Sequence, residues 1–192
     1  MPISSAKRYQ ASHIARLIMQ AMNFECCQYF AGKNHSLDDF ERMMIRLVES
    51  EHSQYSYRNT LVALGENGEV KGICVSYDGK DLHTLRQAFI EAAKDSLDRD
   101  FSNMDDETQG GELYIDSLAV EERYRHQGIA TSLLEATIDK ARQEGIGAVG
   151  LLVDKGNPQA EHLYHDVGFR HVGDSTWGGH EMKHLQFILN KT

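Results

Sequence analysis

The sequence predicts a globular α/β fold, and three observations support this prediction. The chain has 192 residues, 41% of them hydrophobic, which suits one domain. Segments with apolar residues at helical spacing alternate with short apolar segments typical of strands. Turn signals such as Asn67-Gly68 separate these segments. We therefore expect residues 1–192 to form a single domain that contains both helices and strands.

Composition narrows the function classes. No segment approaches the roughly 20 apolar residues of a membrane span, and the first residues do not read as a signal peptide. Cys26, Cys27 and Cys74 lack the spacing of a disulfide framework, which favours a cytoplasmic location. The net charge of −9 disfavours nucleic acid as a partner. It is compatible with a cationic substrate such as an amine, although solubility alone also explains it.

The N-terminal part predicts one strand and two helices. We expect the strand over Ile3–Tyr9 and a first helix capped by Ser12. A second helix begins after Ser36, with Asp39 completing a capping box. Residues 22–33 between the helices are less regular. The aromatic side chains of that segment are expected in the core rather than along a groove: Phe24, Tyr29 and Phe30.

The middle of the chain predicts a hairpin, a helix and a long loop. Strands over Thr60–Leu64 and Val70–Tyr77 flank the Asn67-Gly68 turn. Apolar residues at helical spacing predict a helix over Asp81–Arg99. Residues 100–111 have no periodic pattern and are acidic, so we expect an exposed loop, and a loop of this length is often functional.

The C-terminal part predicts strands and helices in alternation. Glu112–Val120 reads as a strand, and a helix follows that includes Ile129 and ends at Gly145. The further expected elements are a buried strand over Ala148–Val153, a helix from Asn157-Pro158 to Gly168, and strands over Phe169–Val172 and Glu181–Leu189. Residues 173–180, which include Trp177, are expected to connect the last two strands.

A short polar turn joins the strand over Glu112–Val120 to the next helix. It carries Arg125, Gly128 and Ala130 in the spacing R-x-x-G-x-A. The first N–H groups of a helix have no partner within the helix, and they favour an anion. Gly128 has no side chain that would block close approach. We therefore interpret the turn as a pyrophosphate-binding site.

Four features in this order resemble the GNAT superfamily of acyl-CoA-dependent N-acetyltransferases. The specific match covers about residues 112–172. The features are the strand end Ile115–Val120, the turn Arg125–Ala130 as the family's (Q/R)-x-x-G-x-(G/A), Leu151–Val153 followed by Asn157, and Ala160, Leu163-Tyr164 and Gly168-Phe169 as A-x-x-L-Y-x-x-x-G-F.

The resemblance implies a mixed, mainly antiparallel, splayed central sheet flanked by helices. A helical insertion, about residues 79–111, then lies between the third and fourth strands. The resemblance also implies that acetyl-CoA, the acyl donor, binds where the fourth and fifth strands diverge. The coenzyme-binding residues that it implies are Leu118, Ala119, Val120, Arg125, His126, Gln127, Gly128, Ile129, Ala130, Thr131, Asn157 and Tyr164.

Three residues are candidates for the chemistry. Tyr164 matches the family's tyrosine near the sulfur, often proposed as the general acid, with core packing as the alternative. The amine must lose a proton before it attacks, which suits a carboxylate. Glu112 and Asp116 are the candidate bases, and they are not separated from each other or from a structural role at a strand end.

The alternation of side chains along a strand bears on these carboxylates. It places Glu112 and Asp116 on one face together with Tyr114. The opposite face would then carry Leu113, Ile115 and Ser117. A β-bulge, which is common in this strand of the family, would shift the alternation locally.

The sequence indicates the acceptor-binding residues less specifically than the coenzyme-binding residues. The insertion lies where the acceptor enters in this family, and the acidic side chains of its loop would attract a cationic amine: Asp105, Asp106 and Glu107. A solvated loop is the more frequent explanation of such a charge cluster. Trp177 and His180 border the acceptor site or a dimer contact in this interpretation, with simple packing as the alternative. The acceptor is a small molecule or a protein, and a homodimer is compatible with the family.

The expected reaction is acetyl transfer from acetyl-CoA to a primary amine by direct attack in a ternary complex. The alternative is a non-catalytic acyl-CoA-binding sensor or interaction module. Neither a G-x-x-x-x-G-K-[ST] nor a G-x-G-x-x-G motif occurs, which disfavours other nucleotide-binding enzymes. No metal is expected: His162 and His165 have no evident third ligand, and His180 and His184 share a strand face but lie far apart for one ion, so scattered surface histidines explain them better.

Overall fold

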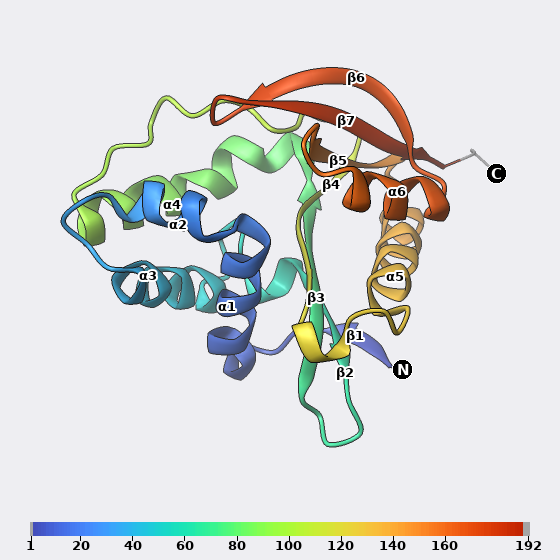
Figure 1. The fold of residues 1–192 in the computed structure, drawn as a ribbon, viewed down its shortest axis with the longest axis horizontal. Coiled ribbons are helices and arrows are strands. Elements are labelled where there is room, and N and C mark those ends of the chain that lie inside the picture. The colour runs from blue at the N-terminus through green and yellow to red at the C-terminus, as the bar shows by residue number, and fades with distance from the viewer. Residues whose placement is uncertain (1, 190–192) are drawn as a thin grey trace.

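The computed structural model describes residues 2–189, and its centre is a seven-stranded open sheet (Figure 1). The strand order is β1-β2-β3-β4-β5-β7-β6, and only the β4–β5 pair is parallel. The mixed, mainly antiparallel sheet that the sequence predicts is therefore confirmed. The strands are β1 (Ile3–Ser5), β2 (Thr60–Leu64), β3 (Val70–Asp78), β4 (Leu113–Val120), β5 (Ala148–Asp154), β6 (Arg170–Trp177) and β7 (His180–Ile188).

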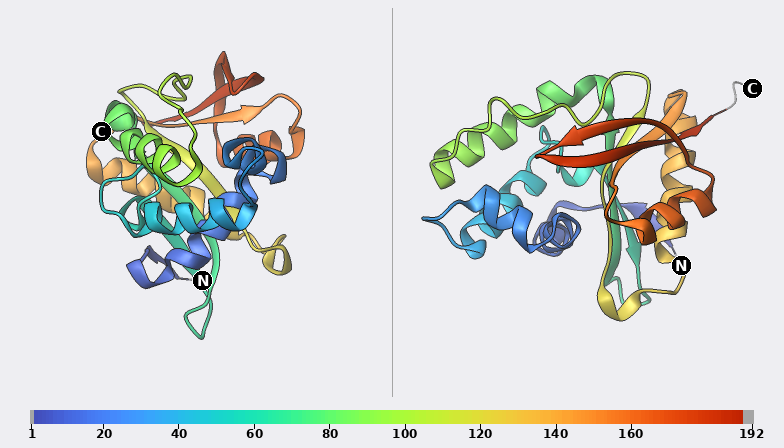
Figure 2. Two further views of the ribbon diagram at one scale, coloured as in Figure 1. Left: turned by 90° about the vertical axis from the view of Figure 1, so that its left-hand side faces the viewer. Right: turned by 45° about the horizontal axis from the view of Figure 1, so that its top comes forward.

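Helices cover both faces of this sheet. The helices before residue 100 lie on one side and those after residue 128 on the other, and the β6–β7 hairpin reaches across towards the side of the earlier helices (Figures 1 and 2). Within residues 2–189, no helix is both long and apolar enough to span a membrane. The helices are α1 (Ala11–Met22), α2 (Phe24–Ala31), α3 (Leu37–Glu49), α4 (Leu82–Leu97), α5 (Ile129–Glu144) and α6 (Pro158–Val167).

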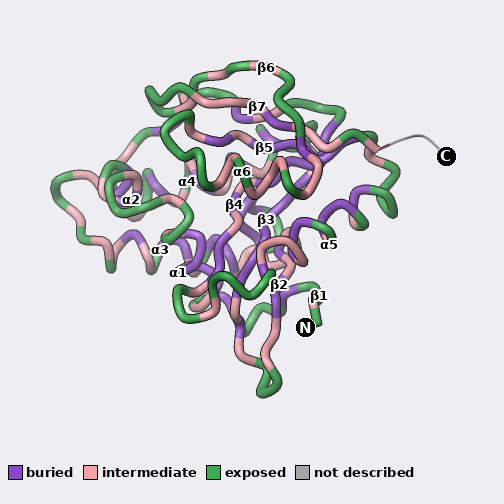
Figure 3. The backbone as a smooth tube through the Cα atoms, turned by 45° about the vertical axis from the view of Figure 1, so that its right-hand side comes forward, coloured by how far each residue is buried: buried purple, intermediate pink, exposed green. Residues whose placement is uncertain are grey.

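Two apolar clusters hold these layers together. One packs α1 to α4 against β2 and β3, with Phe40, Met43 and Ile73 fully buried. The other packs α5 and α6 against β4 and β5, with Leu133 and Phe169 at its centre. Buried segments accordingly follow the central strands and the inward faces of α1 and α5 (Figure 3). The sheet is thus a two-sided scaffold, and the sites lie at its edges and ends.

The N-terminal predictions need three corrections. The first strand ends at Ser5 rather than Tyr9, and α1 begins at Ala11, so Ser12 lies inside the helix instead of capping it. Residues 24–31, predicted as irregular, form α2, because the side chain of Asn23 caps its first turn by accepting from the Cys26 N–H.

The aromatic residues of α2 do not all enter the core. Phe30 is buried, whereas Phe24 is 67% and Tyr29 62% exposed. A helix of eight residues on the surface turns only one stripe of side chains inwards, which explains the difference. The prediction of core packing is therefore wrong for Phe24 and Tyr29.

Residues 173–177 were predicted as a connection but belong to β6, which pairs with β7 from Arg170 to Trp177. The connection itself is the Gly178-Gly179 turn. This strand lies at the edge of the sheet and is largely exposed, so its sequence lacks the apolar alternation that marks a buried strand.

The predicted helix of the insertion is confirmed as α4. The sequence predicts an exposed loop after this helix, and that prediction is wrong for two residues of the loop, Phe101 and Glu107, which are buried. Phe101 packs edge-to-face against Phe30, and Glu107 is buried against Arg86 of α4. A side chain that neutralises a carboxylate allows an acidic loop to turn inwards.

Two irregularities of β4 shape the region that the motifs mark. β4 pairs with β5 only at Leu113 with Val149 and Tyr114 with Gly150, and beyond these pairs the two strands separate. A bulge leaves Asp116 without a partner in β3, between the pairs of Ile115 and Ser117. The sheet is therefore splayed, as predicted, and the bulge lies just beyond the point of separation.

Candidate active site

The polar turn leads directly into α5. Gly128 is the N-cap and has a φ of 75°, a left-handed conformation that favours glycine. The first backbone bond of the helix runs from the Ser132 N–H to the Gly128 carbonyl, and no side chain caps this end. The N–H groups of Ile129, Ala130 and Thr131 are therefore left without a helical partner. A side chain at 128 would meet no atom within 4 Å, so the space in front of these groups is open.

A cleft of about 600 Å³ extends from this turn to α6, and we call it the turn cleft. Its walls are the free edge of β4, the turn, and one face of α6. Of the predicted coenzyme-binding residues, Gln127 does not line it. The lining residues are Leu118, Ala119, Val120, Tyr124, Arg125, His126, Gly128, Ile129, Ala130, Thr131, Asn157, Gln159, Ala160, Leu163 and Tyr164.

Helix α6 presents Asn157 and Tyr164 to the turn cleft. Asn157 is the N-cap, and its Oδ1 accepts from the Ala160 N–H at 3.1 Å. The ring of Tyr164 packs edge-to-face against Phe169. Burial raises the pKa of the Tyr164 phenol, so this residue is a neutral proton donor at physiological pH.

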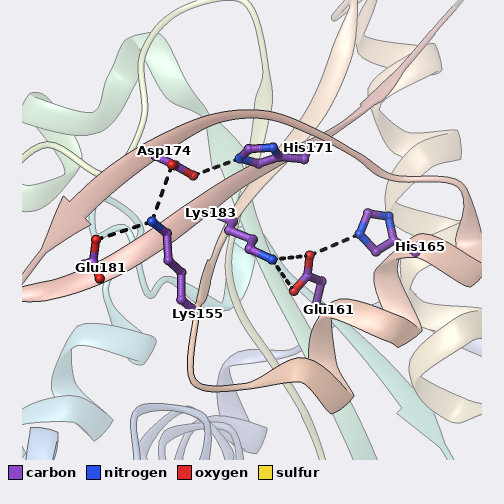
Figure 4. A network of polar contacts seen from close by, with 7 residues as sticks. All are labelled: Lys155, Glu161, His165, His171, Asp174, Glu181 and Lys183. Carbon is purple, nitrogen blue, oxygen red and sulfur yellow. Dashed lines mark hydrogen bonds and ion pairs between the residues drawn. The ribbon is translucent and has the colours of Figure 1, made fainter.

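Polar contacts on the outer side fix α6 to the sheet (Figure 4). Lys183 of β7 donates to both carboxylate oxygens of Glu161 at 2.8 Å, and His165 contacts the same carboxylate. Lys155, just after β5, lies between Asp174 and Glu181 of the β6–β7 hairpin. The Lys183–Glu161 pair therefore ties the helix that carries Tyr164 to β7, and the Lys155 contacts tie the end of β5 to the β6–β7 hairpin.

A second cavity, of about 380 Å³, lies on the other side of β4, and we call it the inner chamber. It shares Leu118, Asn157, Ala160 and Tyr164 with the turn cleft, so the two spaces meet at Tyr164. The remaining residues come from α1 and α2, the segment before β2, the insertion loop, β4, β5 and the β6–β7 hairpin. They are Ala21, Met22, Asn23, Cys26, Tyr55, Glu107, Tyr114, Asp116, Ser117, Leu152, Val153, Asp154, Trp177, His180 and Met182.

Asp116 faces the inner chamber from the bulge of β4. Gln54 donates to its Oδ2 at 3.1 Å, and Ser117 donates to its Oδ1 at 2.9 Å. Burial and the nearby charge of Glu107 raise the pKa of the Asp116 carboxyl to about 7. A carboxylate with this pKa both accepts and releases a proton near neutral pH.

Glu107 comes from the insertion loop and stands next to Asp116. Arg86 pairs with it, and their side chains are 4% and 6% exposed. Tyr77 donates to the same carboxylate at 3.0 Å, and Gln54 links it to Asp116. The insertion therefore supplies a buried charge pair to the environment of the candidate base.

Glu112, the other candidate base, has a different environment. It is 1% exposed and does not line the inner chamber. Thr108, His184 and Gln186 bond its carboxylate at 2.7 to 2.8 Å. Burial opposes its ionisation, but these hydrogen bonds prevail and lower the pKa of the carboxyl. Glu112 thus connects the insertion to β7 across β5.

Glycine at position 150 allows this crossing. A Cβ there would lie 1.8 Å from the Glu112 carboxylate, so only glycine leaves room for it. Gly150 is also the last β5 residue paired with β4. The Glu112 cluster therefore braces the sheet where the two strands begin to separate.

The predicted acceptor residues are distributed over several positions. Glu107 lines the inner chamber, Trp177 lines it and a neighbouring cavity, and Asp105 lines only that neighbouring cavity. Asp106 lines neither and lies against His83 and Arg86. Sequence patterns had placed all three acidic residues on one solvated loop, and burial of Glu107 is what separates them.

Several residues in the lining of the inner chamber, or bonded to that lining, were not predicted. Gln54 and Tyr55 lie in a polar segment that was interpreted as a connection, and Arg86 lies on a helix without any motif. Helical spacing gave one usable signal, because Arg86 falls four residues after Leu82 and three before Phe89, on the buried face of α4. No sequence signal marks Gln54.

The histidines have ordinary partners. His162 faces Asp166, His180 faces Asp154, and His184 bonds Glu112. Within residues 2–189, no group of three or more potential metal ligands occurs. Cys26 lines the inner chamber, and burial, aided by Asp116, raises the pKa of its thiol to about 11, so it is not a ready thiolate.

Comparison with a family model gives an extended match. The model described as the acetyltransferase (GNAT) family matches residues 18–169. A crystal structure of an acetyltransferase superposes with a TM-score of 0.81 at 29% identity, covering 99% of this chain and 100% of that chain. An N-acetyltransferase from Staphylococcus aureus Mu50 gives 0.84 at 24% identity, over 97% and 100%, which shows a common fold.

Curated relatives are similar over shorter stretches. N-alpha-acetyltransferase 30 of Saccharomyces cerevisiae is 43% identical over 56 residues, 29% of this chain and 32% of the relative. The chain matches only 20% to 47% of the length of its curated relatives. Activities and partners of those whole proteins therefore do not carry over directly.

Proposed function

The chain belongs to the GNAT acetyltransferase family, and from this premise we propose that it transfers an acetyl group from acetyl-CoA to a primary amine by direct attack in a ternary complex. We further propose that residues 1–192 act as one domain, with residues 79–111 as an insertion; residue 1 and residues 190–192 lie outside the described part. The observation that carries the proposal is the junction of the turn cleft and the inner chamber at Tyr164.

The turn cleft suits the donor. Free N–H groups at the start of α5 and the open space before Gly128 fit a pyrophosphate. The edge of β4 around Leu118 and Val120 is free because β5 has diverged, so its backbone can pair with an extended amide-containing arm. In this proposal a backbone N–H of that edge also polarises the thioester carbonyl.

The inner chamber suits the acceptor. Asp116 takes a proton from the ammonium, directly or through water, and the amine attacks the thioester carbon. The C–N bond forms and the C–S bond breaks, and Tyr164 gives a proton to the leaving thiolate; the second proton, which the nitrogen loses as the amide forms, restores the Tyr164 phenol. The environments of the two carboxylates support Asp116 rather than Glu112 as the base, since only Asp116 faces the chamber and has a raised pKa.

An amine acceptor also agrees with the name of the yeast relative, an N-alpha-acetyltransferase. The test is a screen of amine acceptors for release of free coenzyme A thiol, with mass spectrometry of each product. We expect one acetylated amine per thiol released. Coenzyme binding without thiol release from any amine would contradict the proposal and favour a non-catalytic acyl-CoA-binding module.

A further inference from the structure

A third cavity adjoins the inner chamber, and we call it the outer chamber. It has a volume of about 380 Å³ and lies between α2, the insertion loop and the turn of the β6–β7 hairpin. Asn23, Cys26, Trp177 and His180 line both chambers, so the two are continuous. A molecule whose reacting group is at Asp116 can therefore extend outwards past Trp177.

Aromatic side chains form the middle of the outer chamber. Phe30 and Phe101 pack edge-to-face with ring centroids 5.1 Å apart, and Trp177 lies 6.3 Å from Phe30. Tyr29 adds an exposed ring beside them. Such walls bind an apolar chain, and their ring faces attract a cation.

Carboxylates dominate the charge of both chambers. Glu25, Asp100 and Asp105 line the outer chamber, and all three are exposed. Neither lysine nor arginine lines either chamber. Arg99 packs on the rings of Tyr29 and Phe101 and lines a separate surface hollow, and Arg86 donates to the backbone carbonyls of Met104 and Asp105 but pairs with Glu107. The lining of the outer chamber therefore carries three carboxylates and neither lysine nor arginine.

Local contacts distinguish these carboxylates from those further in. Arg86 pairs with Glu107, and His180 pairs with Asp154. Ion pairs within residues 2–189 do not include Glu25, Asp100 or Asp105. Asp100 accepts two hydrogen bonds from Ser102. Glu25 and Asp105 are therefore the carboxylates of the outer chamber that are most available to bind a ligand.

On the basis of the proposed function, we propose that the acceptor is a primary diamine. One amino group is acetylated beside Asp116, an apolar spacer lies along Phe30, Phe101 and Trp177, and the second ammonium lies near Glu25 and Asp105. A free amino acid would bring its own carboxylate against this surface, whose lining includes neither lysine nor arginine to offset the repulsion. A monoamine would leave the outer carboxylates unused.

A matched series of ligands tests the second charge. Hexamethylenediamine, n-hexylamine and ε-aminocaproate have the same spacer and differ only at the far end. Isothermal titration calorimetry of the protein saturated with coenzyme A measures binding without turnover. We expect the diamine to bind about tenfold more tightly than hexylamine, a difference of roughly 1.4 kcal/mol, and aminocaproate to bind most weakly.

Paired variants test the place of the second charge. Glu25→Gln with Asp105→Asn should reduce the preference for the diamine to about twofold or less. Glu91→Gln with Asp95→Asn removes the same charge from the exposed face of α4 and should leave the preference unchanged. A fall of equal size in the control pair would show a general charge effect and overturn the assignment.

The outcomes separate this inference from the proposed function. Equal binding and equal thiol release with the diamine and hexylamine would uphold acetyl transfer and overturn the diamine. Tighter binding of aminocaproate, or faster acetylation of a peptide amino terminus than of the diamine, would also overturn it. Selective diamine binding without thiol release would instead contradict the proposed function.

Discussion

The turn cleft and the inner chamber meet at Tyr164, yet they are built from different parts of the chain. The turn cleft uses backbone groups of β4 and of the start of α5, which are adjacent in sequence. The inner chamber uses side chains from both halves of the chain, from Ala21 to Met182. One region binds through local geometry, and the other depends on how distant elements pack.

The same contrast holds for two carboxylates on one strand. Glu112 and Asp116 are four residues apart, but hydrogen bonds lower the pKa of Glu112, while burial and Glu107 raise that of Asp116. Sequence assigned them equal roles, and packing gives them different ones. Variants in each region should therefore change different measurements.

The largest effect is expected from the turn. Gly128→Glu places a carboxylate where an anion would bind, so the Kd of coenzyme A should rise by roughly 100-fold or more, with loss of transfer. Gly145→Glu is the control at the other end of α5, with a φ of 70° and equally open space. Both variants should lose similar thermal stability, since each puts a non-glycine residue at positive φ. Retained affinity in Gly128→Glu, measured by calorimetry, would contradict the pyrophosphate site.

Asp116→Asn should have the next largest effect, on the acceptor side alone. Removal of the base should lower kcat by about 10²–10⁴-fold and leave the Kd of coenzyme A unchanged.

Glu112→Gln should keep kcat within about threefold, because Glu112 lies outside the inner chamber. It should instead lower Tm by several degrees, since it disrupts a buried cluster worth roughly 1–3 kcal/mol. The reverse pattern in steady-state kinetics and thermal melts would exchange the two roles.

Tyr164→Phe tests the junction itself. It preserves the ring that packs on Phe169 and removes only the hydroxyl, so coenzyme affinity should persist. The kcat should fall by roughly 10- to 100-fold if the phenol protonates the thiolate. Unchanged kcat and an unchanged pH profile would leave Tyr164 with a packing role.

Glu107→Gln should give a smaller effect, seen in the pH dependence. The pKa of Asp116 is raised to about 7, so kcat should increase with pH through that value as the base loses its proton. Loss of the Glu107 charge lowers the pKa of Asp116, and the rising limb should move about one unit to lower pH. The measurement is kcat at saturating substrates between pH 5 and 9, roughly the range on both sides of this pKa.

A double variant controls for the charge left on Arg86. Arg86→Gln with Glu107→Gln removes two opposing charges, and the limb should then move less than in Glu107→Gln alone. It also avoids an unpaired buried guanidinium, which would cost roughly 3–5 kcal/mol. An equal shift in both variants would show that the charge of Arg86 does not act on Asp116, and no shift in Glu107→Gln would show that Glu107 does not act through its charge.

Local sequence was sufficient for much of the fold and for the donor side. The Arg125–Ala130 turn, the capping of α6 by Asn157 and the Asn67-Gly68 hairpin each depend on neighbouring residues, so they were predictable. The mixed, splayed sheet followed from the family resemblance and is confirmed. The roles assigned to the turn residues stay predictions.

The acceptor side was not predictable for a physical reason. Gln54 bonds Asp116, 62 residues away, and Glu107, 53 residues away. Arg86 and Glu107 each read as surface residues, and only their mutual neutralisation makes burial favourable. Helix α2 read as irregular because its apolar residues serve both the core and a cavity wall.

Direct transfer at the junction is the central claim, and single-turnover mass spectrometry tests it most directly. The protein is mixed with stoichiometric acetyl-CoA, first alone and then with a diamine. We predict that, before the amine is added, the protein stays unmodified and no free coenzyme A is released. The reason is that the raised pKa of Cys26 keeps the thiol that lines the inner chamber protonated. Acetylated amine and free coenzyme A should then appear together in equal amounts. An acetylated protein that forms before the amine arrives would contradict direct attack.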